Sequence, residues 1–258
     1  MRRTVTTLLV GALLLVAVPA MAEPMTDEAT LDEVMAYLDG QRVDLGIPGL
    51  AVAIVQSGEV LSVETMGEAA PGEPVTADTL FLIISISMSI AAVALVQLAD
   101  GGLVDLDAPF SNYLPETAPG GDDVTVLDLI HHRSGISPEE DTRPEDDQTT
   151  LESTVLRVAD SFGPAGDFNY TNVNYDATAL IVERVSETPY ETYVAANIFT
   201  PARMADAVVG WEGANHPEVA SGHYPWVALG YRPHDEYRPG TELGGAVTYA
   251  NIDDMAAN

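Results

Sequence analysis

The chain has 258 residues, of which 40 are acidic and 10 are basic, so its formal net charge at pH 7 is −30. This balance argues against nucleic acid and anionic lipid as partners, because both need a basic surface. A solvated acidic surface is typical of halophilic proteins, since salt screens repulsion between like charges; a cationic partner is the alternative. All the basic residues are arginines, and the absence of cysteine excludes disulfides and thiolate metal ligands.

The beginning of the chain has the layout of a secretory signal peptide. Two arginines are followed by the apolar run Leu8–Val18 and by a small-x-small cleavage site at residues 20–22. The apolar run is short for a membrane anchor. We therefore expect residues 1–22 to be a signal peptide and residues 23–258 to form one domain. The mature protein would be exported, periplasmic or extracellular, with no stable membrane span.

The pattern of apolar residues predicts a mixture of helices and short strands. A capped helix from Leu31 to about Asp44 precedes a β-hairpin around Gln56–Glu59, and an apolar helix lies within Phe81–Gly101. Further segments are assigned as helices at 124–132, 151–160, 176–186 and 190–198, an exposed acidic loop at 137–150, and loops with short strands from 205 onward. A hairpin followed mainly by helices indicates an α+β fold. A two-stranded hairpin needs more strands, and their scarcity after residue 187 suggests a chain that stops early.

Four positions could carry chemistry. Ser85 lies where an apolar run turns into a helix, and Met88 follows one turn later on the same face. A lysine at position 88 could take the proton of the serine, and a helix N-terminus could stabilise an oxyanion. Tyr170 and Asn172 lie in a polar loop before a helix, where a phenol can shuttle protons and an amide can bind a carbonyl. Taken alone, Ser85 could instead be a simple N-cap.

Four sequence blocks together resemble a known superfamily. "TLFLIISISMSIAAVALVQLADGGLVDLDAPFSNYLPE" is similar to a segment that begins F-R-I-G-S-x-[ST]-K-S, and "VTVLDLIHHRSGI" is similar to "ITVRHLLTHTSGI". "FNYTNVNYDATALIVERVSETPYETYVAANIFTPARM" and "GGAVTYANIDDMA" match later blocks in the same order. The chain thus resembles the serine β-lactamase and D-alanyl-D-alanine peptidase superfamily, in its class C β-lactamase-like and esterase-like branch.

The resemblance implies both a fold and a set of roles. The fold would be an α/β sandwich of the β-lactamase/transpeptidase type, with an antiparallel sheet flanked by helices and a mostly helical lobe. Ser85 would be the acylated nucleophile, Tyr170 the proton shuttle and Asn172 the group that binds the substrate amide, whereas His132 would be structural. The substrate would be a small molecule or peptidoglycan-like, with no cofactor and no metal, because the histidine spacings fit no common ligand pattern.

Three departures from the family pattern bear on activity. Met88 stands where the motif has lysine, and losing a positioned base costs about 10²–10⁴ in rate. "FLII" stands where the motif has "FRIG", which brings apolar bulk next to Ser85. The chain also ends before a K-T-G or H-x-G strand, so we expect an incomplete domain that lacks one oxyanion donor. The hypotheses are a serine hydrolase acting on a β-lactam, a peptidoglycan stem peptide or a small ester, a ligand- or partner-binding pseudoenzyme of the same fold, and an altered copy that does little.

Overall fold

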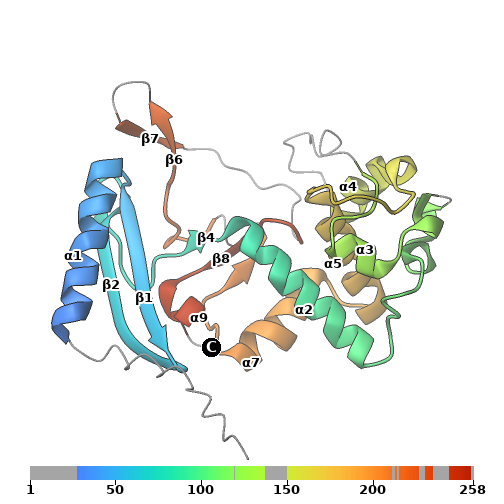
Figure 1. The fold of residues 1–258 in the computed structure, drawn as a ribbon, viewed down its shortest axis with the longest axis horizontal. Helices are drawn as coiled ribbons and strands as arrows, with labels where there is room; N and C mark the ends of the chain where they lie inside the picture. The colour runs from blue at the N-terminus through green and yellow to red at the C-terminus, as the bar shows by residue number, and fades with distance from the viewer. Residues whose placement is uncertain are drawn as a thin grey trace, which may run out of the picture.

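The computed structural model describes residues 28–118, 120–136, 150–210, 213, 215–226, 230–234 and 244–256. The expected signal peptide and nearly all of the expected acidic loop lie outside these described residues. Helix α1 (Glu28–Leu45) covers one face of the long β1–β2 ribbon, and a mostly helical lobe lies at the other end of the molecule (Figure 1). The helices and small antiparallel sheets confirm the α+β class predicted from the sequence.

The N-terminal strands form the predicted hairpin. Strand β1 (Gly49–Gln56) pairs antiparallel with β2 (Glu59–Ala70), and Gln56 faces Glu59 in the register. The two turn residues, Ser57 and Gly58, have φ values of 54° and 80°. This pair of left-handed residues is the conformation that matches the twist of a tight hairpin. The short strand β3 (Glu73–Pro74) pairs with β2 and completes a sheet in the order β1-β2-β3.

A second small sheet joins distant parts of the chain. Strand β4 (Phe81–Leu82) pairs with β8 (Thr248–Ala250), which also pairs with β5 (Val208–Val209), all antiparallel. The pairing of β4 with β8 joins residues that are more than 160 positions apart in the sequence. Strand β4 runs directly into the 3-10 turn η1 (Ile84–Ile86) and helix α2 (Ser87–Asp100), so this sheet anchors the start of α2.

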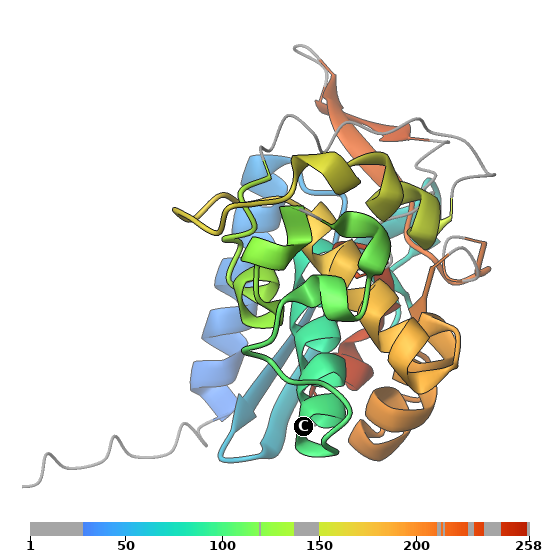
Figure 2. The ribbon, with the colours of Figure 1, turned by 90° about the vertical axis from the view of Figure 1, so that its right-hand side faces the viewer.

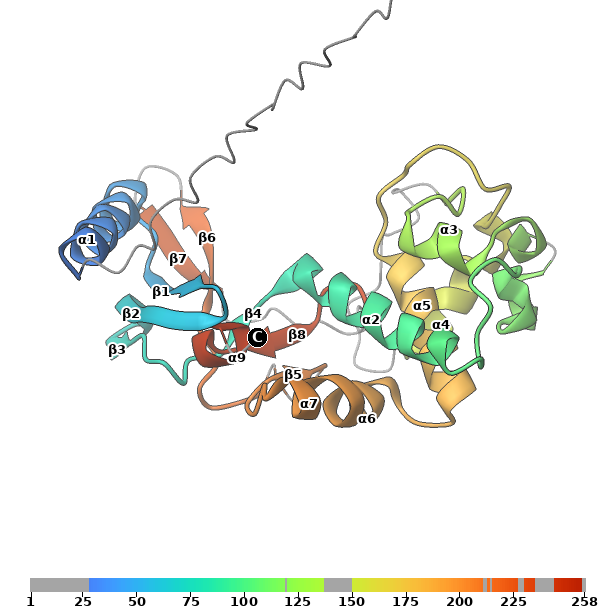
Figure 3. The same cartoon turned by 60° about the horizontal axis from the view of Figure 1, so that its bottom comes forward.

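The helical lobe is built around α2 and α5 (Val173–Ser186), which pack against each other. The first ten residues of α5 are all buried, and Ala91, Ala94 and Leu95 of α2 have no exposed surface. Each large apolar side chain buried in this way stabilises the fold by about 1.5–3 kcal/mol. Figure 3 shows α2 and α5 side by side, and Figure 2 shows the lobe in front of the strands. This rigid pair carries the elements of the candidate site.

Shorter elements complete the lobe and its connections. They are the helices α3 (Val126–Ile130), α4 (Leu151–Arg157), α6 (Tyr190–Val194), α7 (Thr200–Ala202) and α9 (Ile252–Ala256), the 3-10 turns η2 (Phe110–Asn112), η3 (Pro115–Thr117), η4 (Gly120–Asp123) and η6 (Ala159–Ser161), the π-helical turn η7 (Ala195–Phe199), and the hairpin of β6 (Gly222–Trp226) and β7 (Gly230–His234). No helix within the described ranges is long and apolar enough to cross a membrane.

Several helices differ in extent from the sequence prediction. Helices α3 and α4 are shorter than the helices predicted over 124–132 and 151–160. Helix α5 begins at Val173 rather than Asp176, because Asn172 already has helical dihedral angles (φ −66°, ψ −30°). The helix predicted over residues 190–198 is present, but it passes from α6 through η7 into α7 and ends at Arg203, whose φ is 61°. The polar loop that carries Tyr170 is therefore shorter than expected and leads directly into the buried α5.

Candidate active site

The backbone around Ser85 is held by the second sheet. The N–H of Ile83 donates to the carbonyl oxygen of Thr248 (2.9 Å), and the N–H of Thr248 donates to Oγ of the buried Ser87 (3.1 Å). Between these two anchors, Ser85 lies exposed in the 3-10 turn η1. The N-cap position of α2 is Ile86, and no side chain caps it, so the structure does not support the reading of Ser85 as the N-cap of α2.

The structure brings Ser85, Met88 and Tyr170 together. The hydroxyl of Tyr170 donates a hydrogen bond to Oγ of Ser85 at 2.6 Å, across 85 residues of sequence. The same hydroxyl lies 3.4 Å from Sδ of Met88, whose side chain is buried in the first turn of α2. A thioether is only a weak acceptor, so the bond to Ser85 is the stronger of the two. Tyr170 itself remains 44% exposed, which leaves the pair open to a ligand.

Asn172 lies at the start of α5, two residues after Tyr170, and is partly buried. The chain passes close above it at Gly245, where an added Cβ would come within 3.0 Å of Cβ of Asn172. At the neighbouring Gly244 an added Cβ would lie 1.9 Å from the carbonyl oxygen of Tyr175. The two glycines therefore allow the segment before β8 to cross the N-terminus of α5. In the sequence, the block "GGAVTYANIDDMA" contributed to the family resemblance, but it did not indicate that its two glycines pack against α5.

Sequence reasoning assigned His132 a structural role, and the structure adds a contact with the candidate site. The imidazole ring stacks on Tyr170, with ring centroids 4.5 Å apart and an interplanar angle of 29°. Tyr175 lies on another side and donates its hydroxyl to the carbonyl oxygen of Ile130 at 2.9 Å. Burial raises the pKa of Tyr175, and the nearby Tyr170 raises it further. Tyr175 is therefore a neutral hydrogen-bond donor that holds this side of the lobe to α3.

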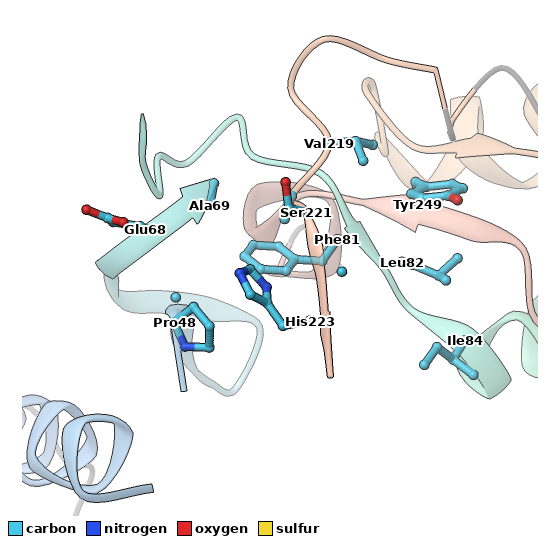
Figure 4. A pocket seen from close by; sticks show the side chains of 13 residues that line it. Pro48, Glu68, Ala69, Phe81, Leu82, Ile84, Val219, Ser221, His223 and Tyr249 are labelled. Carbon is cyan, nitrogen blue, oxygen red and sulfur yellow. The ribbon is translucent and has the colours of Figure 1, made fainter. Parts of the chain in front are cut away.

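A cavity of about 680 Å³ opens beside this site. Its wall includes Ile84, the residue directly before Ser85, and Figure 4 shows Phe81, Leu82 and Ile84 following one another from β4 into η1. The cavity is also lined by His223. The lining is therefore largely apolar close to the serine.

Within the described residues, no group of three or more His, Asp or Glu side chains could hold a metal ion.

Comparisons with known proteins confirm the β-lactamase-like architecture that the sequence predicts. A protein-family model described as "Beta-lactamase" matches residues 28–257. Esterase EstB of Burkholderia gladioli is 30% identical over 252 residues (80% of this chain, 63% of that protein). A beta-lactamase of Yersinia enterocolitica is 26% identical over 206 residues (79% and 51%). A solved class C beta lactamase superposes with a TM-score of 0.74 at 22% identity, over 91% of this chain and 65% of that one. The chain thus spans about half to less than two thirds of the length of the proteins that it matches.

Proposed function

The chain belongs to the β-lactamase family, and we propose that it is a serine hydrolase of this family that forms an acyl-enzyme at Ser85. The observation that carries the proposal is the 2.6 Å hydrogen bond between the hydroxyl of Tyr170 and Oγ of Ser85. A nucleophile paired with a proton-transfer group within hydrogen-bond reach is the signature of covalent catalysis. Because relatives include an esterase and a beta-lactamase, we propose an ester or amide substrate: a small ester, a β-lactam or a peptidoglycan stem peptide.

In the proposed reaction, Oγ of Ser85 forms a bond to the carbonyl carbon of the substrate. The serine proton passes by way of the Tyr170 hydroxyl to the leaving nitrogen or oxygen as its bond to the carbonyl carbon breaks. Water then hydrolyses the resulting ester on Ser85. Asn172 is proposed to bind the substrate amide or carbonyl, as its place beside Tyr170 at the start of α5 allows. The cavity whose wall includes Ile84 would receive the acyl portion of the substrate.

Met88 sets the expected rate of this reaction. Its sulfur lies 3.4 Å from the hydroxyl of Tyr170, at the position where an amine could assist proton transfer. A thioether cannot accept and release a proton at neutral pH, and losing a positioned base lowers rates by about 10²–10⁴. We therefore expect slow acylation. The same observation favours a second candidate function, in which the protein binds its ligand or partner at Ser85 without turnover.

Covalent labelling separates the two candidates. The chain is incubated with a fluorescent penicillin and, separately, with a fluorophosphonate, and mass spectrometry locates the added mass. We expect slow labelling at Ser85 that is absent in Ser85→Ala and faster by about 10²-fold or more in Met88→Lys. Rapid labelling of the native chain would refute the argument from Met88. No labelling of either the native chain or Met88→Lys would refute the hydrolase and leave the binding function.

We also propose that the protein is exported after cleavage before Glu23. The basic start, the short apolar run and the small residues at 20 and 22 support this proposal. N-terminal sequencing of the protein secreted by its native cell type tests it. A mature chain that begins at Glu23 is the expected result, and an intact Met1 on the accumulated protein would contradict export by cleavage.

A further inference from the structure

We propose that His132 is a positioning residue, whose imidazole fixes the phenol of Tyr170 at the place where it meets Ser85. This inference rests on the function proposed above and adds a residue to it. The imidazole is 7% exposed and lies stacked on the phenol at a centroid distance of 4.5 Å. Much of the rest of Tyr170 faces solvent, since the residue is 44% exposed. Packing against the imidazole therefore sets the orientation of the phenol ring.

A network of hydrogen bonds fixes the imidazole in turn. The N–H of Ile136 donates to Oγ of Ser134 (3.4 Å), and that hydroxyl donates to Oδ1 of Asn174 (2.5 Å). The amide orientation that results points Nδ2 of Asn174 at Nδ1 of His132, 3.3 Å away. The backbone N–H of Thr171, which is only a donor, also lies 3.4 Å from Nδ1. Both neighbours are N–H donors, so Nδ1 acts as the acceptor between them.

The backbone on both sides of the stack is tied together as well. His132 follows the end of α3 with a φ of 55°, a left-handed conformation that is uncommon for residues other than glycine. Its carbonyl oxygen accepts from the N–H of Asn169 at 2.7 Å, and that of Arg133 accepts from Gly166 at 3.0 Å. These two hydrogen bonds therefore hold the loop that leads to Tyr170 against His132 and Arg133. A strained residue that is over-determined by its surroundings is a feature of functional sites.

Three aromatic side chains surround the imidazole, and only one of them reaches the serine. Tyr175 lies 5.1 Å away at 50°, Phe168 lies 5.6 Å away edge-on, and Tyr170 is the most nearly parallel at 29°. A plain core histidine would stabilise the fold through all three contacts. A positioning residue would act on Ser85 through Tyr170 alone. This difference makes the role testable against a purely structural one.

Matched variants separate ring stacking from folding. His132→Phe keeps a flat ring without Nδ1, His132→Gln keeps polar atoms without a ring, and His131→Gln changes the exposed neighbouring histidine as a control. We expect the rate of fluorophosphonate labelling at Ser85 to fall about tenfold to a hundredfold in His132→Gln, the loss that a misplacement of about 1 Å produces. His132→Phe should retain most of the rate, and His131→Gln should retain all of it.

Two further measurements identify the route of the effect. In a Tyr170→Phe background, His132→Gln should cause no further loss of labelling, because the imidazole acts through the missing hydroxyl. In ¹⁹F NMR, 3-fluorotyrosine at position 170 should shift in His132→Gln and not in His131→Gln. An unchanged resonance, or an equal loss with and without the Tyr170 hydroxyl, would overturn the positioning role. A shifted resonance in a chain that never labels would uphold the contact and refute the hydrolase.

Discussion

Ile84, the residue directly before Ser85, has a φ of 47°, and this value supports a quantitative prediction. A β-branched side chain in the left-handed region is a genuine outlier, with a cost of about 1–2 kcal/mol that glycine does not incur. The family segment similar to this stretch has glycine at the same place. Ile86, two residues later, is the matched control, since its φ is −61° and it is 52% exposed against 55% for Ile84.

Four variants isolate the strain: Ile84→Ala, Ile84→Gly, Ile86→Ala and Ile86→Gly. Comparing glycine with alanine at one position removes the contribution of the lost side-chain contacts. At position 86, glycine should be less stable than alanine by about 0.5–1 kcal/mol, because glycine loses more conformational entropy on folding. At position 84, relief of about 1–2 kcal/mol of strain exceeds that entropic cost. Glycine should therefore be more stable than alanine at position 84 by up to about 1.5 kcal/mol.

The free energy of unfolding of each variant is measured by urea titration with circular dichroism as the signal. The expected result is an opposite sign of the glycine–alanine difference at the two positions. Alanine more stable than glycine by the same amount at both positions would refute the strain at Ile84. The comparison also bears on access to Ser85, because Ile84→Gly removes a side chain from the wall of the neighbouring cavity.

Two more predictions concern the surroundings of the site. Arg184 donates a hydrogen bond to the carboxylate of Glu116 (2.7 Å) and holds the pKa of that carboxyl below 4.5. The pair therefore stabilises the folded state fully above pH 4.5, and this stabilisation is lost as the pH falls through the lowered pKa. Glu116→Gln should lower the free energy of unfolding by at most about 1 kcal/mol near neutral pH, with no difference from the native chain in acid, and a constant difference in urea titrations at both pH values would contradict the pairing. In Gly244→Ala, the new Cβ would clash with the carbonyl oxygen of Tyr175, so this variant should be less stable and should label more slowly at Ser85. Gly40→Ala, in α1, has no atom within 4 Å of the new Cβ and should be more stable by about 0.5–1 kcal/mol. Equal effects of the two substitutions in thermal unfolding would contradict the close approach of Gly244 to α5.

The parts of the fold that sequence reasoning predicted are those with local signals. The turn at Gln56–Glu59 and the helix α2 are encoded by residues that lie next to one another, and both are present. The strands β4, β5 and β8 are two or three residues long, and their pairing depends on partners far away in the chain. No periodicity can develop over so few residues. The scarcity of strands predicted after residue 187 has the same cause, because β5–β8 are all short.

In the candidate site, too, the sequence indicated some features, and others could be seen only in the structure. Roles for Tyr170 and Ser85 were inferred from motifs in family order, and the structure places their hydroxyls 2.6 Å apart. The stacking of His132 on Tyr170 was not inferred, because nothing local to "HHRSGI" tells which of its two histidines turns inward. That choice is made by the left-handed backbone at His132 and by the bonds from Asn174 and Thr171. The conformation of Ile84 likewise became visible only once η1 was seen to follow β4.

The short contact between two hydroxyls links the geometry to the two candidate functions. The hydroxyls of Tyr170 and Ser85 lie 2.6 Å apart, and attack by Ser85 requires its proton to pass toward Tyr170. Met88 offers this phenol a second, weaker acceptor and no positive charge, so nothing at position 88 favours the phenolate. An ammonium group there would stabilise the negative charge that develops on the phenol as it takes the serine proton. We therefore expect the native chain to favour binding and slow acylation, and Met88→Lys to speed acylation at Ser85.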